Sequence, residues 1–300
     1  MRRDITFTSQ GDNCVGWLYL PDDLKTGTRA PAIVMAGAMT SVKELTLPGY
    51  AERFAKAGFV TLVFDFRFWG GSGGQPRNQV LPYEQLQDLR NAITWLVEQP
   101  EVDAQRIGGW GISLGGGHML YLSAFDRRLK AVVATATAIN NVRTFEMVFG
   151  REGFQGFLAQ IGQDRGNRFK TGSVATTLQA WGKPGEMCAF PQEEAFEFYT
   201  NAKATVAPHY ENIVTLESVE KFVEYNPDFA VDLASPTAVL FVHPEHDLVP
   251  IALVRAVYER TLEPKKFVSL DCKHSDVYDK DPWMSRSVKA AIDWFKKNLK

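Results

Sequence analysis

A serine between two glycines is the most chemically informative feature of the chain. The residues Gly111-Ile112-Ser113-Leu114-Gly115 form a G-x-S-x-G pattern. The short run 106–110 before it predicts a strand, and the small and apolar residues 116–122 after it predict a helix. A sharp strand-to-helix turn strains such a serine and leaves room only for glycine-sized neighbours. Its hydroxyl is exposed at the helix N-terminus, where the helix dipole favours the negative charge of an acyl-transfer oxyanion. Ser113 is therefore the candidate nucleophile.

A serine nucleophile needs a base that removes its proton and an acid that orients the base. The turn at Ser113 resembles that of the α/β-hydrolases, in which the acid and then the histidine follow the serine along the chain. Of the five histidines, His274 fits this order best, because it follows the apolar run 267–270 and precedes an amphipathic helix around 288–295. His118 and His209 are interpreted as structural or surface residues.

The acid should follow the preceding strand, which is predicted at 237–242. Asp247 is the preferred candidate, and Glu245 is the reserve. His243 and His246 lie in the same stretch and could suggest a metal site together with the two acids. However, the four side chains share one tight loop and have no evident distant ligand, so we predict no metal.

Four further segments accompany the serine motif in a fixed order. They read Gly37-Ala38-Met39-Thr40-Ser41-Val42-Lys43-Glu44, Asp65-Phe66-Arg67-Phe68-Trp69-Gly70-Gly71-Ser72-Gly73, the stretch from Pro244 to Pro250, and His274-Ser275-Asp276-Val277-Tyr278. With the serine motif, they resemble the α/β-hydrolases over nearly the whole chain, and within them the dienelactone-hydrolase and cocaine-esterase/X-prolyl-peptidase-like group. The resemblance implies the α/β-hydrolase fold. Relatives of this type include enzymes that act on polyketide-like acyl chains.

The resemblance also implies an oxyanion hole made of backbone N–H groups. One donor is the N–H of Leu114, directly after the nucleophile, and the other is the N–H of Met39. The family has a His-Gly pair before the second donor, whereas this chain reads Gly37-Ala38. If the loop is shifted by one residue, Ala38 supplies the second donor.

The alternation of strand-like and helix-like runs predicts a mostly parallel central sheet with helices on both faces. Residues 1–139 and 231–300 are expected to form this core, and residues 140–230 an inserted, mainly helical cap above the carboxyl ends of the strands. The strands expected before the cap are 5–9 and 14–20 as an antiparallel pair, 31–36, 60–65, 106–110 and 129–134, with helices at 50–57 and 83–98.

The expected cap is rich in aromatic residues, most of which would form its own core. A small insertion has too little volume to bury all of them, so we expect some to line an apolar acyl pocket. The expected pocket residues are Phe145, Phe149, Phe154 and Trp181.

Charge and composition exclude other classes of protein. The formal net charge is −2, and no basic stripe suggests nucleic acid or an anionic membrane as a partner. No window approaches a membrane span, and three cysteines favour a reducing compartment, so a cytoplasmic protein is expected. The glycines 109–115 also resemble a dinucleotide fingerprint, but the next strand runs into 134–138 without a ribose-binding acid, so no cofactor is expected. A homodimer is a possible assembly.

These features predict a serine hydrolase that cleaves an ester, thioester or lactone of an apolar, medium-sized or aromatic acyl substrate, a small molecule, through an acyl-enzyme on Ser113. If the cap excludes water, the same intermediate can pass its acyl group to an alcohol or amine, so an acyltransferase is the alternative. A peptidase and a non-catalytic ligand-binding relative are less favoured. Cys272, near His274, is either a reactive thiol or a buried bystander.

Overall fold

An eight-stranded sheet forms the centre of the computed structural model, which describes residues 1–173 and 175–300. The strand order is β1-β2-β4-β3-β5-β6-β10-β11, and every pairing from β4 to β11 is parallel. The strands are β1 (Arg2–Ser9), β2 (Asp12–Tyr19), β3 (Ala30–Ala36), β4 (Val60–Phe64), β5 (Val102–Ile112), β6 (Leu129–Thr135), β10 (Ala238–His246) and β11 (Lys265–Lys273). The mostly parallel sheet expected from the sequence is confirmed.

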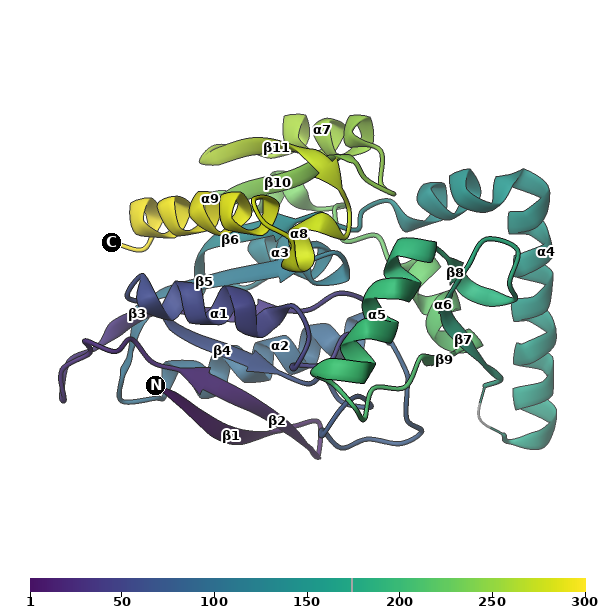
Figure 1. Ribbon diagram of the computed structural model, residues 1–300, viewed down its shortest axis with the longest axis horizontal. Helices are drawn as coiled ribbons and strands as arrows, with labels where there is room; N and C mark the ends of the chain where they lie inside the picture. The colour runs from purple at the N-terminus through teal and green to yellow at the C-terminus, as the bar shows by residue number, and fades with distance from the viewer. Residues whose placement is uncertain (174) are drawn as a thin grey trace.

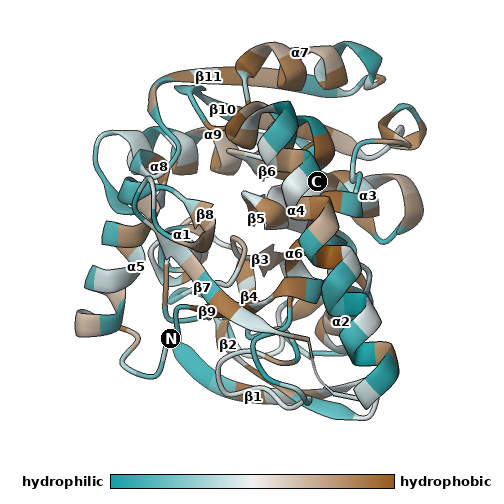
Figure 2. Cartoon of the chain, turned by 90° about the vertical axis from the view of Figure 1, so that its right-hand side faces the viewer, coloured by the Kyte–Doolittle hydropathy of each residue, from teal (hydrophilic) through white to brown (hydrophobic). Residues whose placement is uncertain are grey.

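Helices cover both faces of this sheet and bury two hydrophobic clusters (Figure 1). The cluster on one face includes residues of α1 (Leu47–Lys56) and α9 (Trp283–Asn298), with the short α8 (Asp276–Asp279) beside them. The cluster on the other face includes residues of α2 (Pro82–Val97), α3 (Leu114–Phe125) and α7 (Ile251–Arg260). The outer helices α5 and α7 alternate hydrophobic and hydrophilic residues, as expected of helices with one buried side (Figure 2). Within the described residues, no helix has the length and apolarity that crossing a membrane requires.

The expected antiparallel pair at the start of the chain is present as β1 and β2. Gln10 and Gly11 connect the two strands, with φ of 50° and 87°. Two consecutive positive φ values give a turn whose twist matches that of the paired strands. β5 begins at Val102, four residues before the expected start at 106, and Val102 pairs with Ala30 of β3.

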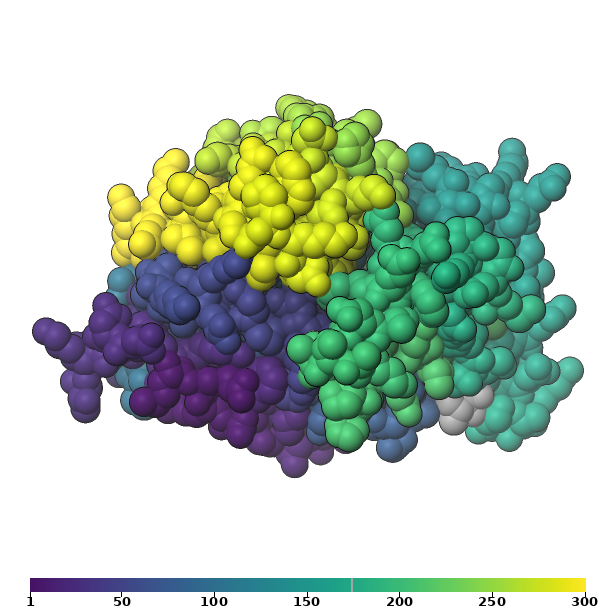
Figure 3. Space-filling model, in the orientation of Figure 1, coloured from purple at the N-terminus to yellow at the C-terminus, as the bar shows by residue number. Residues whose placement is uncertain are grey.

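Between β6 and β10 the chain leaves the sheet and forms an insertion at one end of the molecule (Figure 1). Its elements are α4 (Asn141–Thr171), β7 (Thr177–Gly182), β8 (Cys188–Pro191), α5 (Glu193–Thr205), β9 (Ile213–Thr215) and α6 (Leu216–Glu224), followed by a 3₁₀ turn at Val231–Leu233. The three strands form a small sheet in the order β8-β7-β9, which the sequence did not predict. On the face seen in Figure 3, part of the insertion packs against the C-terminal part of the chain. The division into a core and a cap at 140–230 stays a prediction.

Candidate active site

Ser113 stands on the tight turn between β5 and α3, with φ 55° and ψ −118°. Positive φ is rare in residues other than glycine and persists only where the surroundings enforce it. A Cβ atom on Gly111 would lie 2.0 Å from the carbonyl oxygen of Gly115, and one on Gly115 would lie 2.2 Å from that of Ala36. The backbone N–H of Ser113 donates to Thr135 O at 3.0 Å. The close approach of these segments explains why glycines flank the serine.

Asp247 and His274 meet beyond the carboxyl ends of β10 and β11. His274 Nδ1 lies 2.9 Å from each carboxylate oxygen of Asp247, so Nδ1 carries the proton and donates it. The Asp247 side chain is fully buried. Burial raises its pKa, but the neighbouring His274 and the N–H of Val249 outweigh burial and hold the pKa of the carboxyl below its usual value. Asp247 is therefore a buried anion that orients the imidazole.

The other polar residues near Asp247 have separate partners. Glu245 accepts a hydrogen bond from Ser269 at 2.8 Å and does not contact His274. His246 bonds to Asp271 at 2.9 Å on the surface. His243 is buried, and its Nε2 bonds to the carbonyl oxygen of Val249 at 2.9 Å, whereas Asp247 Oδ2 is 3.9 Å away. Over residues 1–173 and 175–300, no cluster of three or more His, Cys, Asp or Glu side chains could hold a metal ion.

Tyr278 completes the surroundings of the imidazole, and the sequence did not reveal its contact. Its hydroxyl lies 3.0 Å from His274 Nε2. Because Nδ1 carries the proton, Nε2 accepts and Tyr278 donates. Burial raises the pKa of Tyr278 above its ordinary value, while contact with Ser113 opposes the rise. The hydroxyl therefore stays protonated near neutral pH. The spacing of four residues from His274 was visible in the sequence and could have indicated this contact on a helical turn.

The two expected oxyanion donors have free N–H groups. Among the described residues, neither Leu114 N nor Met39 N has a hydrogen-bond acceptor. Met39 lines the same cavity as Ser113, whereas Ala38 does not. Thr40, the next residue, has a φ of 62°, a conformation that costs an L-residue about 1–2 kcal/mol. The loop after β3 is thus strained where the oxyanion hole is expected.

A buried ion pair ties this loop to the loop after β4. The ammonium group of Lys43 donates to Asp65 Oδ2 at 2.9 Å, and the Lys43 backbone N–H donates to Asp65 Oδ1 at 2.6 Å. Gly71 N also donates to Asp65 Oδ2, at 2.9 Å. Burial raises the pKa of Asp65, and the charge of Lys43 counteracts the rise. The contacts explain why two of the sequence motifs, 37–44 and 65–73, occur together.

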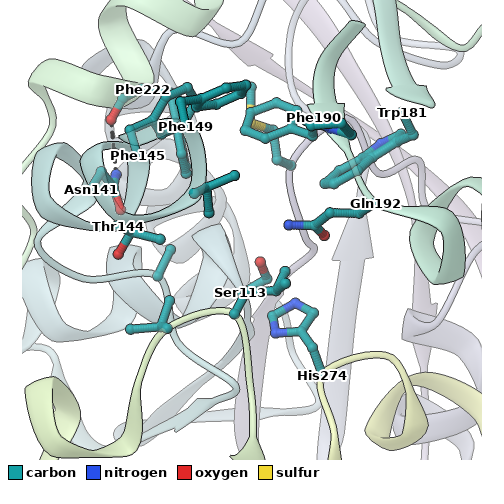
Figure 4. A pocket seen from close by; sticks show the side chains of 16 residues that line it. Ser113, Asn141, Thr144, Phe145, Phe149, Trp181, Phe190, Gln192, Phe222 and His274 are labelled. Carbon is teal, nitrogen blue, oxygen red and sulfur yellow. Dashed lines mark hydrogen bonds between the residues drawn. The ribbon is translucent and has the colours of Figure 1, made fainter. Parts of the chain in front are cut away.

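An apolar cavity opens at Ser113 and His274 (Figure 4). Three of the four expected pocket residues, Phe145, Phe149 and Trp181, line it. Phe154 does not line it and is buried in the hydrophobic core. The lining also includes residues that the sequence analysis did not select: Ala138, Asn141, Thr144, Val148, Phe190, Pro191, Gln192, Phe222, Leu248 and Val249.

Three other candidates have structural or surface positions. His118 is fully buried in α3, 3.1 Å from Tyr225 Oη and 3.0 Å from Gln85 Oε1. His209 is exposed. Burial raises the pKa of the Cys272 thiol to about 12. Because the thiolate is the reactive form, burial and the raised pKa favour the interpretation of Cys272 as a buried bystander.

The sheet, the turn at Ser113 and the position of His274 define an α/β-hydrolase, and the comparisons agree. Residues 11–227 match the family model of the X-Pro dipeptidyl-peptidase (S15) family. The chain belongs to this family.

Relatives that align over most of this chain include a thiohydrolase and a polyketide transferase. A thiohydrolase of Eupenicillium brefeldianum is 31% identical over 88% of this chain and 84% of its own. The polyketide transferase ATR5 of Stachybotrys chlorohalonatus is 31% identical over 91% of this chain and 89% of its own. The crystal structure of the α/β-hydrolase GrgF from Penicillium sp. sh18 has a TM-score of 0.84 and 28% identity over 100% of this chain and 99% of its own. The expected hydrolase fold and the acyl hydrolase or transferase activity are confirmed.

Proposed function

We propose that the chain is a serine hydrolase in which Ser113 attacks an acyl carbonyl. The proton of Ser113 Oγ passes to His274 Nε2, and Asp247 stabilises the imidazolium that forms. The N–H groups of Leu114 and Met39 receive the oxyanion. His274 then returns the proton to the leaving alcohol or thiol, and water releases the acyl group in a second round. The observation that carries the proposal is the 2.9 Å contact between His274 and buried Asp247 beside Ser113.

In the free site, Nε2 accepts a hydrogen bond from Tyr278 rather than from the serine. Proton transfer from Ser113 therefore requires the Tyr278 hydroxyl to give up this acceptor. Hydrogen bonds in such sites often tighten only when substrate is bound. We expect substrate to bring about this exchange.

The proposed substrate is an ester, thioester or lactone with an apolar acyl group. Phenylalanine rings and aliphatic side chains line most of the cavity, which favours an apolar chain or an aromatic group over a sugar or a nucleotide. The names of the thiohydrolase and polyketide transferase relatives favour a thioester or a polyketide-like acyl group.

Peptidase activity, which the family description names, has less support from the cavity. An X-Pro dipeptide presents a free ammonium group, and burying an unpaired charge is costly. No aspartate or glutamate is among the residues that line the cavity beside Ser113. We therefore expect X-Pro substrates to be poor.

Acyl transfer is the second candidate, and a groove next to the cavity favours it. This groove shares His274, Gln192 and Leu248 with the acyl cavity but also contains Glu194 and Lys273. A polar acyl acceptor could approach His274 through the groove while the acyl chain occupies the apolar cavity.

We propose the cytoplasm as the compartment of the protein. The three free cysteines support this proposal, because disulfides are rare in reducing compartments.

The test of the proposal is covalent labelling followed by substrate screening. A fluorophosphonate probe should label Ser113 in the wild-type protein, and peptide mass spectrometry should find no label in Ser113→Ala. Cys272→Ala is the control for the neighbouring thiol and should label normally. Unlabelled wild-type protein, or label that persists in Ser113→Ala, would reject the mechanism.

The screen compares acyl esters, acyl thioesters and an X-Pro anilide, each with and without an added alcohol or amine. Turnover of thioesters or esters that depends on Ser113 supports the hydrolase. Product formed with the added nucleophile at the expense of hydrolysis supports the transferase. Preferential cleavage of the X-Pro anilide would contradict the proposed substrate class.

A further inference from the structure

Three aromatic side chains of the insertion form a continuous buried stack. Trp181 comes from β7, Tyr199 from α5, and Tyr210 from the segment before β9. The rings of Trp181 and Tyr199 are 5.2 Å apart and inclined by 10°, and those of Tyr199 and Tyr210 are 5.1 Å apart and inclined by 20°. All three side chains are buried. Their positions are therefore fixed by packing on one another.

The polar atoms of this stack bond to one short segment of the core. Tyr199 Oη donates to the carbonyl oxygen of Met39 at 2.9 Å. Trp181 Nε1 donates to Thr40 Oγ1 at 2.9 Å, and Tyr210 Oη lies 3.1 Å from the same oxygen. Each contact joins residues 141 or more positions apart in the sequence. The stack therefore connects the insertion to the loop that carries the second oxyanion donor.

The loop needs such support because its own sequence does not favour its conformation. Thr40 is β-branched and has a φ of 62°, a region that such residues avoid. An unfavourable backbone conformation persists only where the surroundings determine it. Trp181 bonds to Thr40 Oγ1, and Tyr199 bonds to the carbonyl oxygen of Met39. The two hydrogen bonds therefore hold both of the residues that the Met39–Thr40 peptide bond joins.

We propose that Trp181, Tyr199 and Tyr210 are positioning residues that hold the Met39 N–H in place for the oxyanion. The inference rests on the proposed serine mechanism and deepens it, because it assigns the alignment of the oxyanion hole to the insertion. Trp181 also lines the acyl cavity. A bound acyl group therefore touches the same ring that bonds to Thr40, which links substrate binding to the alignment of the donor.

The test removes the polar atoms and keeps the rings. Tyr199→Phe should lower kcat about ten- to a hundred-fold and change KM less than about twofold. A small misplacement of a donor reduces the stabilisation of the transition state more than it reduces the binding of the substrate. Thr40→Val, which removes Oγ1, should have a similar effect, and Thr40→Ser, which retains it, should restore most of the activity. Tyr225→Phe is the matched control, because its buried hydroxyl bonds to His118 instead of the loop.

A trifluoromethyl ketone provides the second measurement, because its adduct with the serine places an oxyanion in the hole. Its affinity should fall in parallel with kcat in Tyr199→Phe and Thr40→Val and stay unchanged in Tyr225→Phe. Equal losses in all variants, or unchanged kcat and inhibitor affinity in Tyr199→Phe, would overturn the positioning role. If wild-type protein is not labelled at Ser113, the serine mechanism itself fails. If wild-type protein is labelled at Ser113, but Tyr199→Phe and Thr40→Val retain the wild-type kcat and inhibitor affinity, only the positioning role fails.

Discussion

At the scale of single residues, the proposed mechanism depends on keeping one buried carboxylate charged. Asp247 is removed from solvent, and its pKa is nevertheless low because His274 and a backbone N–H compensate for burial. A neutral amide at this position could present its N–H₂ group to Nδ1, which would favour the tautomer with its proton on Nε2. That tautomer cannot accept the proton of Ser113.

Asp247→Asn should therefore lower kcat by about ten-thousand-fold, the loss expected when the imidazole is held in the wrong tautomer. Glu245→Gln should change kcat less than about threefold, because Glu245 bonds to Ser269 and not to the imidazole. Steady-state kinetics on one ester substrate compares the two variants. The opposite ranking would assign the acid to Glu245.

At the scale of secondary-structure elements, the insertion contributes two sets of aromatic side chains with different positions. Phe145 and Phe149 of α4 face the cavity, and their rings are 5.3 Å apart. Phe154 of the same helix is buried away from the cavity lining. Gly150, with a φ of 69°, interrupts the helix between Phe149 and Phe154. The interruption separates a segment that faces the cavity from a longer segment of the insertion.

Phe149→Ala should change the acyl chain-length preference in kcat/KM, because each methylene in an apolar pocket is worth about 1–3 kcal/mol. Phe154→Ala is the matched control: it should lower the melting temperature and leave relative chain-length preference unchanged, as removal of a buried ring does. An ester series and thermal melting measure both effects. A Phe149 variant with unchanged preference, or an equal shift in the Phe154 variant, would contradict the assignment of the cavity.

The elements that the sequence predicted best are those whose pattern is local. Buried apolar runs define β3, β4 and β6 to within about a residue, and the glycines around Ser113 mark the tight turn between β5 and α3. β7, β8 and β9 were missed because they are short and pair with segments distant in sequence. The contacts of Thr40 with Trp181 and Tyr210 were missed for the same reason, since no local spacing encodes them.

At the scale of the whole molecule, one buried histidine joins three parts of the fold. His118 lies in α3, the helix that follows Ser113, Gln85 in α2, and Tyr225 directly after α6 of the insertion. Gln85 Oε1 can only accept, so His118 Nε2 carries the proton and Nδ1 accepts from Tyr225. The neutral imidazole satisfies both contacts. Protonation would place a donor against the Tyr225 hydroxyl and a charge in the interior.

Acid should therefore destabilise the fold through His118. Burial lowers its pKa from 6.5 to about 3, so the unfolded chain binds this proton more readily than the folded chain. The stability contributed by the neutral imidazole is fully present above pH 6.5 and is lost as the pH falls from 6.5 toward 3. At about pH 4.5 the loss should be roughly 2–3 kcal/mol, because each pKa unit corresponds to about 1.4 kcal/mol. His243, whose pKa burial also lowers, adds a loss of the same sign.

His118→Gln keeps a donor and an acceptor at this position but removes the titration. It should be less stable than the wild type near pH 7, because its shape fits the buried site less well, and should lose less stability between about pH 7 and about pH 4.5. Urea unfolding at both pH values gives the two free energies of unfolding. Exposed His209→Gln is the control and should have the wild-type pH dependence. If His118→Gln loses as much stability in acid as the wild type, the imidazole is not the group that couples protonation to unfolding.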